Sequence, residues 1–188
     1  MIDTEVKKAG AILKSGGTIL YPTDTIWGIG CDATRQESVQ HIYQIKQRAD
    51  SKSMLVLVNG IAMLEEYIES IPARALELIE KTERPTTIIY PGARRLAPNL
   101  LSADGSIGIR ITSDPFCKKL IEFTGLPIVS TSANISGEQA PSSFQKILSP
   151  ILQQVDYLVN WRQDEIAVSA PSSIIKMEKD GSITILRP

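Results

Sequence analysis

The segment Thr18-Ile19-Leu20-Tyr21-Pro22-Thr23-Asp24-Thr25 joins a short apolar run directly to a polar turn. Its first four residues predict a buried strand that ends at Pro22. A hydroxyl and a carboxylate placed just after a buried strand can bind a small polar ligand, and the glycines that follow, Gly28 and Gly30, allow close approach of the backbone. A turn capped by Asp24 explains the same residues, so both interpretations are open at this point.

The residues around this segment alternate between helical and strand patterns. Apolar spacing predicts helices, and short apolar runs predict strands. Because the two alternate, we predict an α/β fold: a single-domain twisted mixed β-sheet flanked by helices, with no linker dividing residues 1–188. The expected helices cover residues 4–15, 36–46, 63–70, 72–81 and 114–124, and the expected strands cover 18–21, 54–58, 86–90, 107–111, 127–129, 173–177 and 183–186.

Composition narrows the classes of function. Twenty Lys and Arg residues against 21 Asp and Glu residues leave a net charge of −1, which gives no overall field that would draw nucleic acid to the protein. The two cysteines, Cys31 and Cys117, lack the spacing of metal ligands and predict free thiols in a reducing cytosol. No secretory signal and no membrane-spanning apolar stretch is present, so we expect a cytoplasmic protein without a membrane partner.

Three further polar clusters follow predicted elements. Lys46-Gln47-Arg48, with Lys52 beyond, ends a helix and offers both a planar guanidinium and compact ammonium groups for anions. The hydroxyl-rich loop expected at 130–134, followed by Gly137, can line a phosphate or nucleotide pocket. In the third, Ser172 precedes one closing strand and Arg187 ends the other. As isolated patterns, a solvated helix end, a Ser/Thr turn and a frayed terminus explain these residues as well.

Several familiar arrangements are missing. The sequence has no P-loop and no glycine-rich dinucleotide fingerprint. Its single histidine, His41, lies inside a predicted helix, which argues against a Ser-His-Asp hydrolase and against a histidine-rich metal site, and we expect no protein-held metal. A chemistry without an obvious base or nucleophile favours catalysis by positioning and charge stabilisation.

Taken together, these motifs resemble the YrdC family of threonylcarbamoyl-AMP synthases. The resemblance rests on Tyr21-Pro22-Thr23-Asp24-Thr25 through Ala33, Lys46-Gln47-Arg48, Ser132-Ala133-Asn134 and the closing Leu186-Arg187-Pro188, in that order along the chain. It implies a YrdC-like fold. It also implies Lys46 and Arg48 as catalytic residues, a threonine and bicarbonate side formed by Thr23, Arg48, Arg110, Ser130 and Ser172, and a nucleotide side formed by Lys46, Lys52, Thr87, Ser132, Asn134 and Arg187.

The activity that the resemblance implies is a nucleotidyl transfer. L-Threonine, bicarbonate and ATP, with Mg²⁺ on the nucleotide, would give threonylcarbamoyl-AMP and pyrophosphate, and a partner complex would transfer the threonylcarbamoyl group to tRNA. Two alternatives stay open. One is a non-catalytic, translation-associated module that binds RNA weakly through the same cations, and the other is a carbamoyl-adenylate-forming enzyme that uses carbamoyl phosphate, as the related domain of hydrogenase maturation does.

Overall fold

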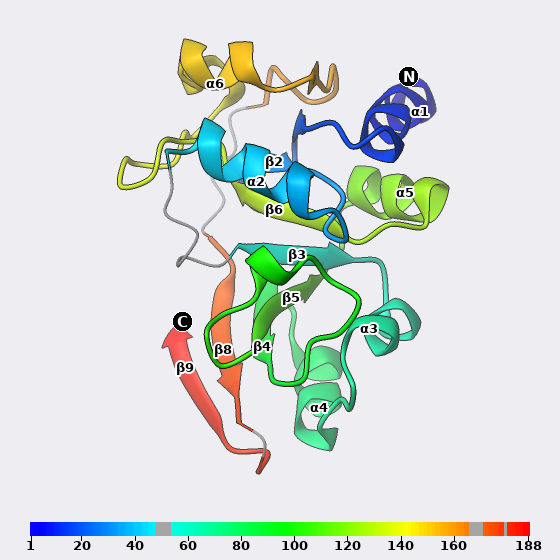
Figure 1. The fold of residues 1–188 in the computed structure, drawn as a ribbon, viewed down its shortest axis with the longest axis vertical. Coiled ribbons are helices and arrows are strands. Elements are labelled where there is room, and N and C mark those ends of the chain that lie inside the picture. Colours follow the sequence, from blue (N-terminus) through cyan, green and yellow to red (C-terminus); the bar gives the residue numbers. More distant parts are fainter. Residues whose placement is uncertain (48–53, 166–170, 179) are drawn as a thin grey trace.

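The computed structural model describes residues 1–47, 54–165, 171–178 and 180–188. Helices and strands alternate through most of this chain (Figure 1). Two single turns of 3-10 helix lie at Pro98–Leu100 and Phe144–Lys146. The helices are α1 (Ile2–Lys14), α2 (Gln36–Ile45), α3 (Ile61–Tyr67), α4 (Ala73–Lys81), α5 (Pro115–Thr124) and α6 (Ser149–Gln154); the strands are β1 (Ile19–Tyr21), β2 (Gly28–Gly30), β3 (Leu55–Val58), β4 (Thr86–Tyr90), β5 (Ile107–Ile111), β6 (Ile128–Ser132), β7 (Tyr157–Leu158), β8 (Ser173–Met177) and β9 (Ile183–Arg187).

In the described part of the chain, the nine strands form one sheet in the order β7-β1-β2-β6-β3-β5-β4-β8-β9. The pairs β1–β7, β3–β5 and β4–β8 are parallel, and the other neighbours are antiparallel. The sheet is strongly twisted, since β8 and β9 run across the direction of β3 (Figure 1). The predicted mixed sheet flanked by helices is therefore confirmed.

Local capping explains why α5 matches the helix predicted at 114–124. The Asp114 carboxylate accepts a hydrogen bond of 2.9 Å from the backbone N–H of Cys117, and Pro115 occupies the first turn of α5. Gly125 ends the same helix with φ 70°, a left-handed conformation that glycine adopts without strain. By contrast, α3 begins at Ile61 and ends at Tyr67, so the predicted helix at 63–70 was placed too far along the chain.

Two of the sequence predictions for the strands were wrong. The strand expected at 127–129 continues to Ser132, so Ser130, Thr131 and Ser132 belong to β6 rather than to a hydroxyl-rich loop. Gly28–Gly30, expected only as a site of close backbone approach, forms β2 between β1 and β6. Both errors have one cause, which is that pairing with neighbouring strands overrides the local pattern: glycine is depleted in strands, and a hydroxyl-rich run favours a turn.

Helices cover the two faces of the sheet unequally. One face packs against α2, α3 and α4 and carries the larger apolar core, to which Val56, Ile88 and Ile109 contribute. On the other face, α1 and α5 lie side by side and cover only the end that holds Tyr21, Leu57 and Ile128 (Figure 1). The remainder of that second face is lined by polar strand residues and forms a cleft.

Gly30 is the position of β2 where a side chain fits least. A Cβ at Gly30 would lie 2.5 Å from the carbonyl oxygen of Val129 and 2.7 Å from Cε1 of the buried Tyr21 ring. We therefore expect Gly30→Ala to lower the free energy of unfolding by about 3 kcal/mol, because backbone and a fully buried ring would both have to move. Urea unfolding measures it. Gly60→Ala, where a Cβ would meet no atom within 4 Å, is the control, and equal effects of the two would contradict the prediction.

Candidate active site

The cleft on the partly uncovered face of the sheet has a volume of about 360 Å³. Its walls come from segments far apart in sequence: the turn after β1, and strands β2, β3, β4, β5, β6 and β8. Seven residues predicted for the site line it, namely Thr23, Thr87, Arg110, Ser130, Ser132, Ser172 and Arg187. The fold thus brings together most of the predicted residues that the structure describes.

Strand alternation explains which side chains face the cleft. In β6, Ser130 and Ser132 line the cleft together with Thr131 at the strand end, whereas Val129, directly before Ser130, packs into the larger core. Arg110 of β5 lines it in the same way, with Ile109 in the core. Because successive residues of a strand point to opposite faces, one run of sequence supplies both the core and the site.

The turn after β1 fixes the hydroxyl of Thr23. This oxygen donates a hydrogen bond of 2.8 Å to the carbonyl of Ile26 and accepts one of 3.0 Å from the backbone N–H of Thr25. It also lies 3.0 Å from the Thr25 hydroxyl, and both threonines line the cleft. Their side chains therefore present a fixed polar edge to any ligand.

Arg110 is a buried cation in the wall of the cleft. Its side chain is 2% exposed, and its Nη2 lies 2.9 Å from Oδ1 of Asp24, whose side chain is 6% exposed. The Arg110 Nε is buried without a hydrogen-bond partner among the described residues. An unpaired buried donor on a charged group is costly, so an anionic ligand that accepts from it would bind favourably.

At the other end of the cleft, Thr87, Ser172 and Arg187 form a network. The hydroxyls of Thr87 and Ser172 are 2.9 Å apart. The Nε of Arg187 donates a hydrogen bond of 2.8 Å to the backbone carbonyl of Ser172, and Nη2 of Arg187 donates to the Ser172 hydroxyl at 3.4 Å. Although β9 ends the chain, Arg187 is thus held in place and is not frayed.

The charges in the cleft favour an anion. Burial lowers the pKa of Arg187, and the like charge of Arg110 lowers it further, so the two guanidinium groups influence one another. Among the described residues that line the cleft there is no Asp or Glu. Two cations surrounded by hydroxyl groups in a confined space match a ligand that carries carboxylate or phosphate groups.

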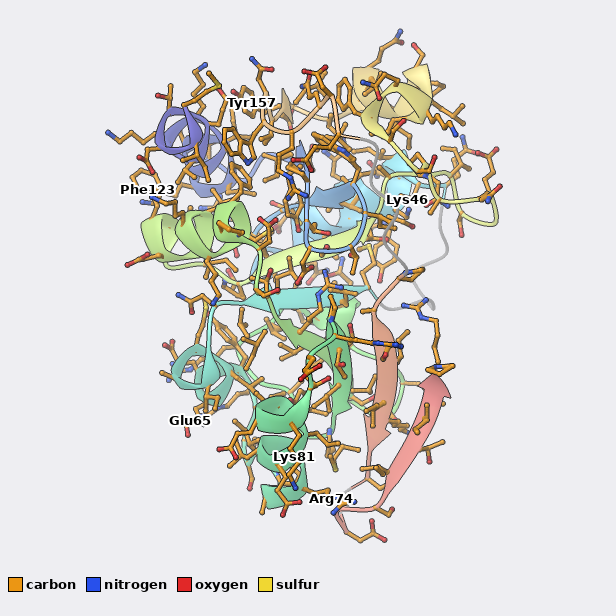
Figure 2. The ribbon with its side chains drawn as sticks, turned by 180° about the vertical axis from the view of Figure 1, so that it is seen from behind. Lys46, Glu65, Arg74, Lys81, Phe123 and Tyr157 are labelled. Carbon is orange, nitrogen blue, oxygen red and sulfur yellow. The ribbon has the colours of Figure 1, made fainter. Side chains whose placement is uncertain are left out.

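Lys46 lies behind the cleft instead of in its wall. It is the C-cap residue of α2 and is 1% exposed, and its ammonium donates hydrogen bonds to the backbone carbonyls of Ser132 and Asn134, the latter at 2.7 Å. Figure 2 labels it where α2 meets the end of β6. The alternative interpretation of Lys46 as part of a solvated helix end is therefore wrong. Its ammonium connects α2 to the end of β6.

Asn134 shapes the turn that follows β6. Its side-chain amide donates to the carbonyls of Ile135 at 2.9 Å and Glu138 at 2.8 Å, while its Oδ1 is buried without a partner among the described residues. Asn134 does not line the cleft as described, and its contact with a nucleotide stays a prediction. Arg48 and Lys52, predicted for the site, lie outside the described residues.

The site also contains residues to which the family resemblance gave no role. Thr25, Gly28 and Gly108 line the cleft, and Asp24 pairs with Arg110. Asp24, Thr25 and Gly28 stand within the motif that drew attention to Thr23, so their neighbourhood was the available signal. Gly108 faces the cleft because β5 alternates, and only the tertiary structure reveals which face is open.

The described residues contain neither a cluster of metal-ligating side chains nor a helix suited to span a membrane. In the described ranges, no group of three or more His, Cys, Asp or Glu side chains is placed to hold a metal ion. Both cysteines are buried and free. Within the same residues, no helix combines the length and the apolar character needed to cross a membrane.

The chain is similar to known proteins over most of its length. The Sua5/YciO/YrdC family model, described as "Telomere recombination", matches residues 11–188. A protein named threonylcarbamoyl-AMP synthase from Acinetobacter baumannii is 32% identical over 84% of this chain and 87% of its own length. One of the same name from Stutzerimonas stutzeri is 30% identical over 84% of this chain and 85% of its own length.

Solved structures share the fold. E. coli YciO matches with a TM-score of 0.85 at 25% identity, covering 100% of this chain and 89% of the YciO chain. P. abyssi Sua5, solved in complex with L-threonine, matches with a TM-score of 0.88 at 23% identity over 97% of this chain, which spans 53% of the Sua5 chain. With a family model that matches nearly the whole sequence and curated relatives at 30% identity and above, this chain belongs to the Sua5/YciO/YrdC family.

Proposed function

We propose that this chain is a threonylcarbamoyl-AMP synthase and that the cleft is where it condenses L-threonine, bicarbonate or carbon dioxide, and ATP. The observation that carries the proposal is the cleft itself: two arginines and a set of hydroxyl groups converge there, and no carboxylate side chain lines it among the described residues. Threonine carries a carboxylate, bicarbonate and ATP are anions, and the adduct of threonine with carbon dioxide carries a second carboxylate. The names of the curated relatives support the same activity.

The two ends of the cleft suit the two halves of the reaction. Thr23, Arg110 and Ser130 would hold the threonine and bicarbonate side, where the unpaired Nε of Arg110 supplies a donor for a carboxylate. Thr87, Ser132 and Arg187 would hold the nucleotide. The hydrogen bond of 2.9 Å between Thr87 and Ser172, a residue assigned to the threonine side, marks where the two substrates would meet.

The reaction needs positioning more than proton transfer. The threonine amine adds to carbon dioxide and loses a proton, giving an N-carboxylate. An oxygen of that carboxylate attacks the α-phosphorus of ATP, the bond from the α-phosphorus to the bridging oxygen breaks, and pyrophosphate leaves. Because two anions must approach, Arg110 and Arg187 would stabilise the charge that concentrates between them, and no histidine or thiol is required.

Magnesium would enter as part of the substrate MgATP. The polar side chains that line the cleft are hydroxyls and cations, which suit the phosphate oxygens and not the metal, so Mg²⁺ would be held by the nucleotide. The positive charges of Arg110 and Arg187 would then offset the negative charge that Mg²⁺ leaves on the phosphates. Lys46, Asn134, Arg48 and Lys52 stay predictions for the nucleotide side, with Arg48 also for bicarbonate.

We further propose that residues 1–188 act as one catalytic domain in the cytoplasm. One sheet runs through the described residues from β7 to β9, with β6 paired to both β2 and β3, which supports a single unit. Two free thiols suit a reducing compartment. The product would pass to a partner complex that transfers the threonylcarbamoyl group to tRNA.

The purified protein should convert L-threonine, bicarbonate and MgATP into threonylcarbamoyl-AMP when pyrophosphatase removes the pyrophosphate. Chromatography with mass detection follows the product, and Arg110→Ala serves as the inactive control. Equal product from the wild type and this variant would overturn the proposal. A second arm replaces threonine and bicarbonate with carbamoyl phosphate; a carbamoyl-adenylate formed only there would assign the other enzyme activity. A third outcome would favour the non-catalytic RNA-binding module: the protein binds RNA with an affinity that depends on salt but not on ATP or threonine, and it forms no threonylcarbamoyl-AMP.

A further inference from the structure

Asp24 has a position that the proposed reaction does not explain. It stands between Thr23 and Thr25, which line the cleft, yet its own side chain does not line it. It lines a second cavity of about 210 Å³ that lies beside β4, β5 and α4, on the other face of the sheet. A charged side chain buried behind a substrate cleft needs a reason, because burying a carboxylate is costly unless it is paired.

The partners of Asp24 all belong to β5 or the residues that follow it. Its Oδ1 lies 2.9 Å from Nη2 of Arg110, and its Oδ2 accepts from the hydroxyl of Thr112 at 3.4 Å and from the backbone N–H of Ser113 at 3.3 Å. Asp24 therefore connects the turn that carries two cleft threonines to the strand that carries the cleft arginine.

The geometry of the pair leaves part of Arg110 free for a ligand. Nη2 of Arg110 and Oδ1 of Asp24 form a close ion pair without hydrogen-bond geometry, since Oδ1 has no hydrogen-bond partner among the described residues. A guanidinium is planar and has five N–H donors, so a carboxylate beside one Nη attracts the group without using its other edge. Nε of Arg110 is buried without a partner among the described residues. The negative charge of Asp24 also offsets part of the positive charge of Arg110 in the cleft wall.

We propose that Asp24 is a positioning residue: its carboxylate holds the Arg110 guanidinium in the cleft wall and thereby sets the affinity for the carboxylate-bearing substrate. The effect on substrate rests on the proposed function, whereas the effect on the Arg110 side chain does not. If the ion pair were merely structural, its loss would affect the binding of all substrates alike. A positioning residue acts selectively on the ligand that Arg110 binds.

The first experiment reads the Arg110 side chain directly. A ¹⁵N–¹H spectrum of the full chain shows arginine Nε–Hε signals, and the signal that disappears in Arg110→Lys identifies Arg110. We expect it to be resolved from the other arginines in the wild type and to collapse into the position of free arginine side chains in Asp24→Asn. An unchanged Arg110 signal in Asp24→Asn would overturn the proposal, whatever the enzyme activity is.

The second experiment separates the substrates kinetically. We expect Asp24→Asn to raise KM for threonine about tenfold or more, as for the loss of a charged hydrogen-bonded partner, while KM for ATP changes less than threefold. In a double-mutant cycle, Asp24→Asn should add little to Arg110→Lys, because both act on one guanidinium. Additive effects, or equal rises in both KM values, would contradict positioning through Arg110.

Two control variants separate an effect on Arg110 from a general folding defect. Asp32→Asn removes another buried carboxylate, which pairs with Arg35 at 3.4 Å and does not line the cleft, and it should leave both KM values unchanged. If Asp24→Asn does not fold, Asp24→Glu decides: a displaced Arg110 signal with a raised threonine KM supports the proposal, and a wild-type signal and KM overturn it. A wild type without synthase activity but with the expected spectra would reject the proposed function and leave the positioning of Arg110 by Asp24 standing.

Discussion

Replacing Arg110 by alanine is expected to lower kcat/KM for threonine by about 1,000-fold, the largest effect of any single substitution in the cleft. The substitution removes a buried charge that pairs with Asp24 and presents an unpaired Nε among the described residues. Removing a buried charge that faces a charged ligand costs about 2–5 kcal/mol of binding free energy, and each 1.4 kcal/mol is tenfold in affinity. Initial rates over a range of threonine concentrations measure the effect.

Two companion variants identify the source of that loss. Arg110→Lys keeps the charge but loses the planar fork, so it should recover only part of the activity. Arg35→Ala removes a half-exposed arginine that lies outside the cleft and should change kcat/KM less than threefold. If Arg110→Ala is fully folded and its kcat/KM for threonine stays within threefold of the wild-type value, then Arg110 does not bind the substrate.

The second large effect is expected at Lys46. Methionine at this position keeps the length and apolar stem of lysine but removes the ammonium that donates to the carbonyls of Ser132 and Asn134. Hydrogen bonds to a charged group contribute about 1.5–3 kcal/mol each, so Lys46→Met should lower the free energy of unfolding by about 4 kcal/mol. Synthase activity should fall with it, because Ser132 lines the cleft and the end of β6 would lose its anchor.

Urea unfolding and product formation, both at low temperature where the variant stays folded, test this prediction. Lys146→Met, at an exposed lysine of a 3-10 turn, is the matched control and should change the free energy of unfolding by less than about 0.5 kcal/mol. A Lys46→Met protein as stable as the wild type would show that the ammonium does not hold β6. Loss of activity in a protein of unchanged stability would instead favour the direct nucleotide contact that the sequence predicted.

Local chemistry made much of the fold predictable. The strands at 86–90 and 107–111 match the prediction at both ends. The first is a run of strand-forming residues between Pro85 and Pro91, and the second alternates isoleucine with other residues between Ser106 and Thr112. The α5 helix was predictable from Asp114, Pro115 and Gly125, whose capping roles depend only on their immediate neighbours. Where strand formation depends on distant partners, as in Gly28–Gly30 and Ser130–Ser132, the local pattern was misleading.

The ordered motifs likewise indicated the cleft before any geometry was known. The family resemblance assigned Thr23, Arg110 and Arg187 to one site, and the fold brings them to one cavity. It also assigned Lys46 to the phosphates, which stays a prediction; in the structure its ammonium donates to the backbone carbonyls of Ser132, the last residue of β6, and of Asn134. A motif preserves which residues matter for a family but does not state which atom each side chain contacts.

The sequence by itself determined the class of this protein: a mixed α/β fold whose chemistry depends on hydroxyls and cations, without a histidine base or a P-loop. Only the tertiary structure decided that Asp24 lies behind Arg110 and that Lys46 is turned inward. The physical reason is that capping and alternation act over a few residues and can be read locally. Burial of a charge depends instead on partners that strand pairing brings from distant parts of the chain, and these partners exist only once the sheet has formed.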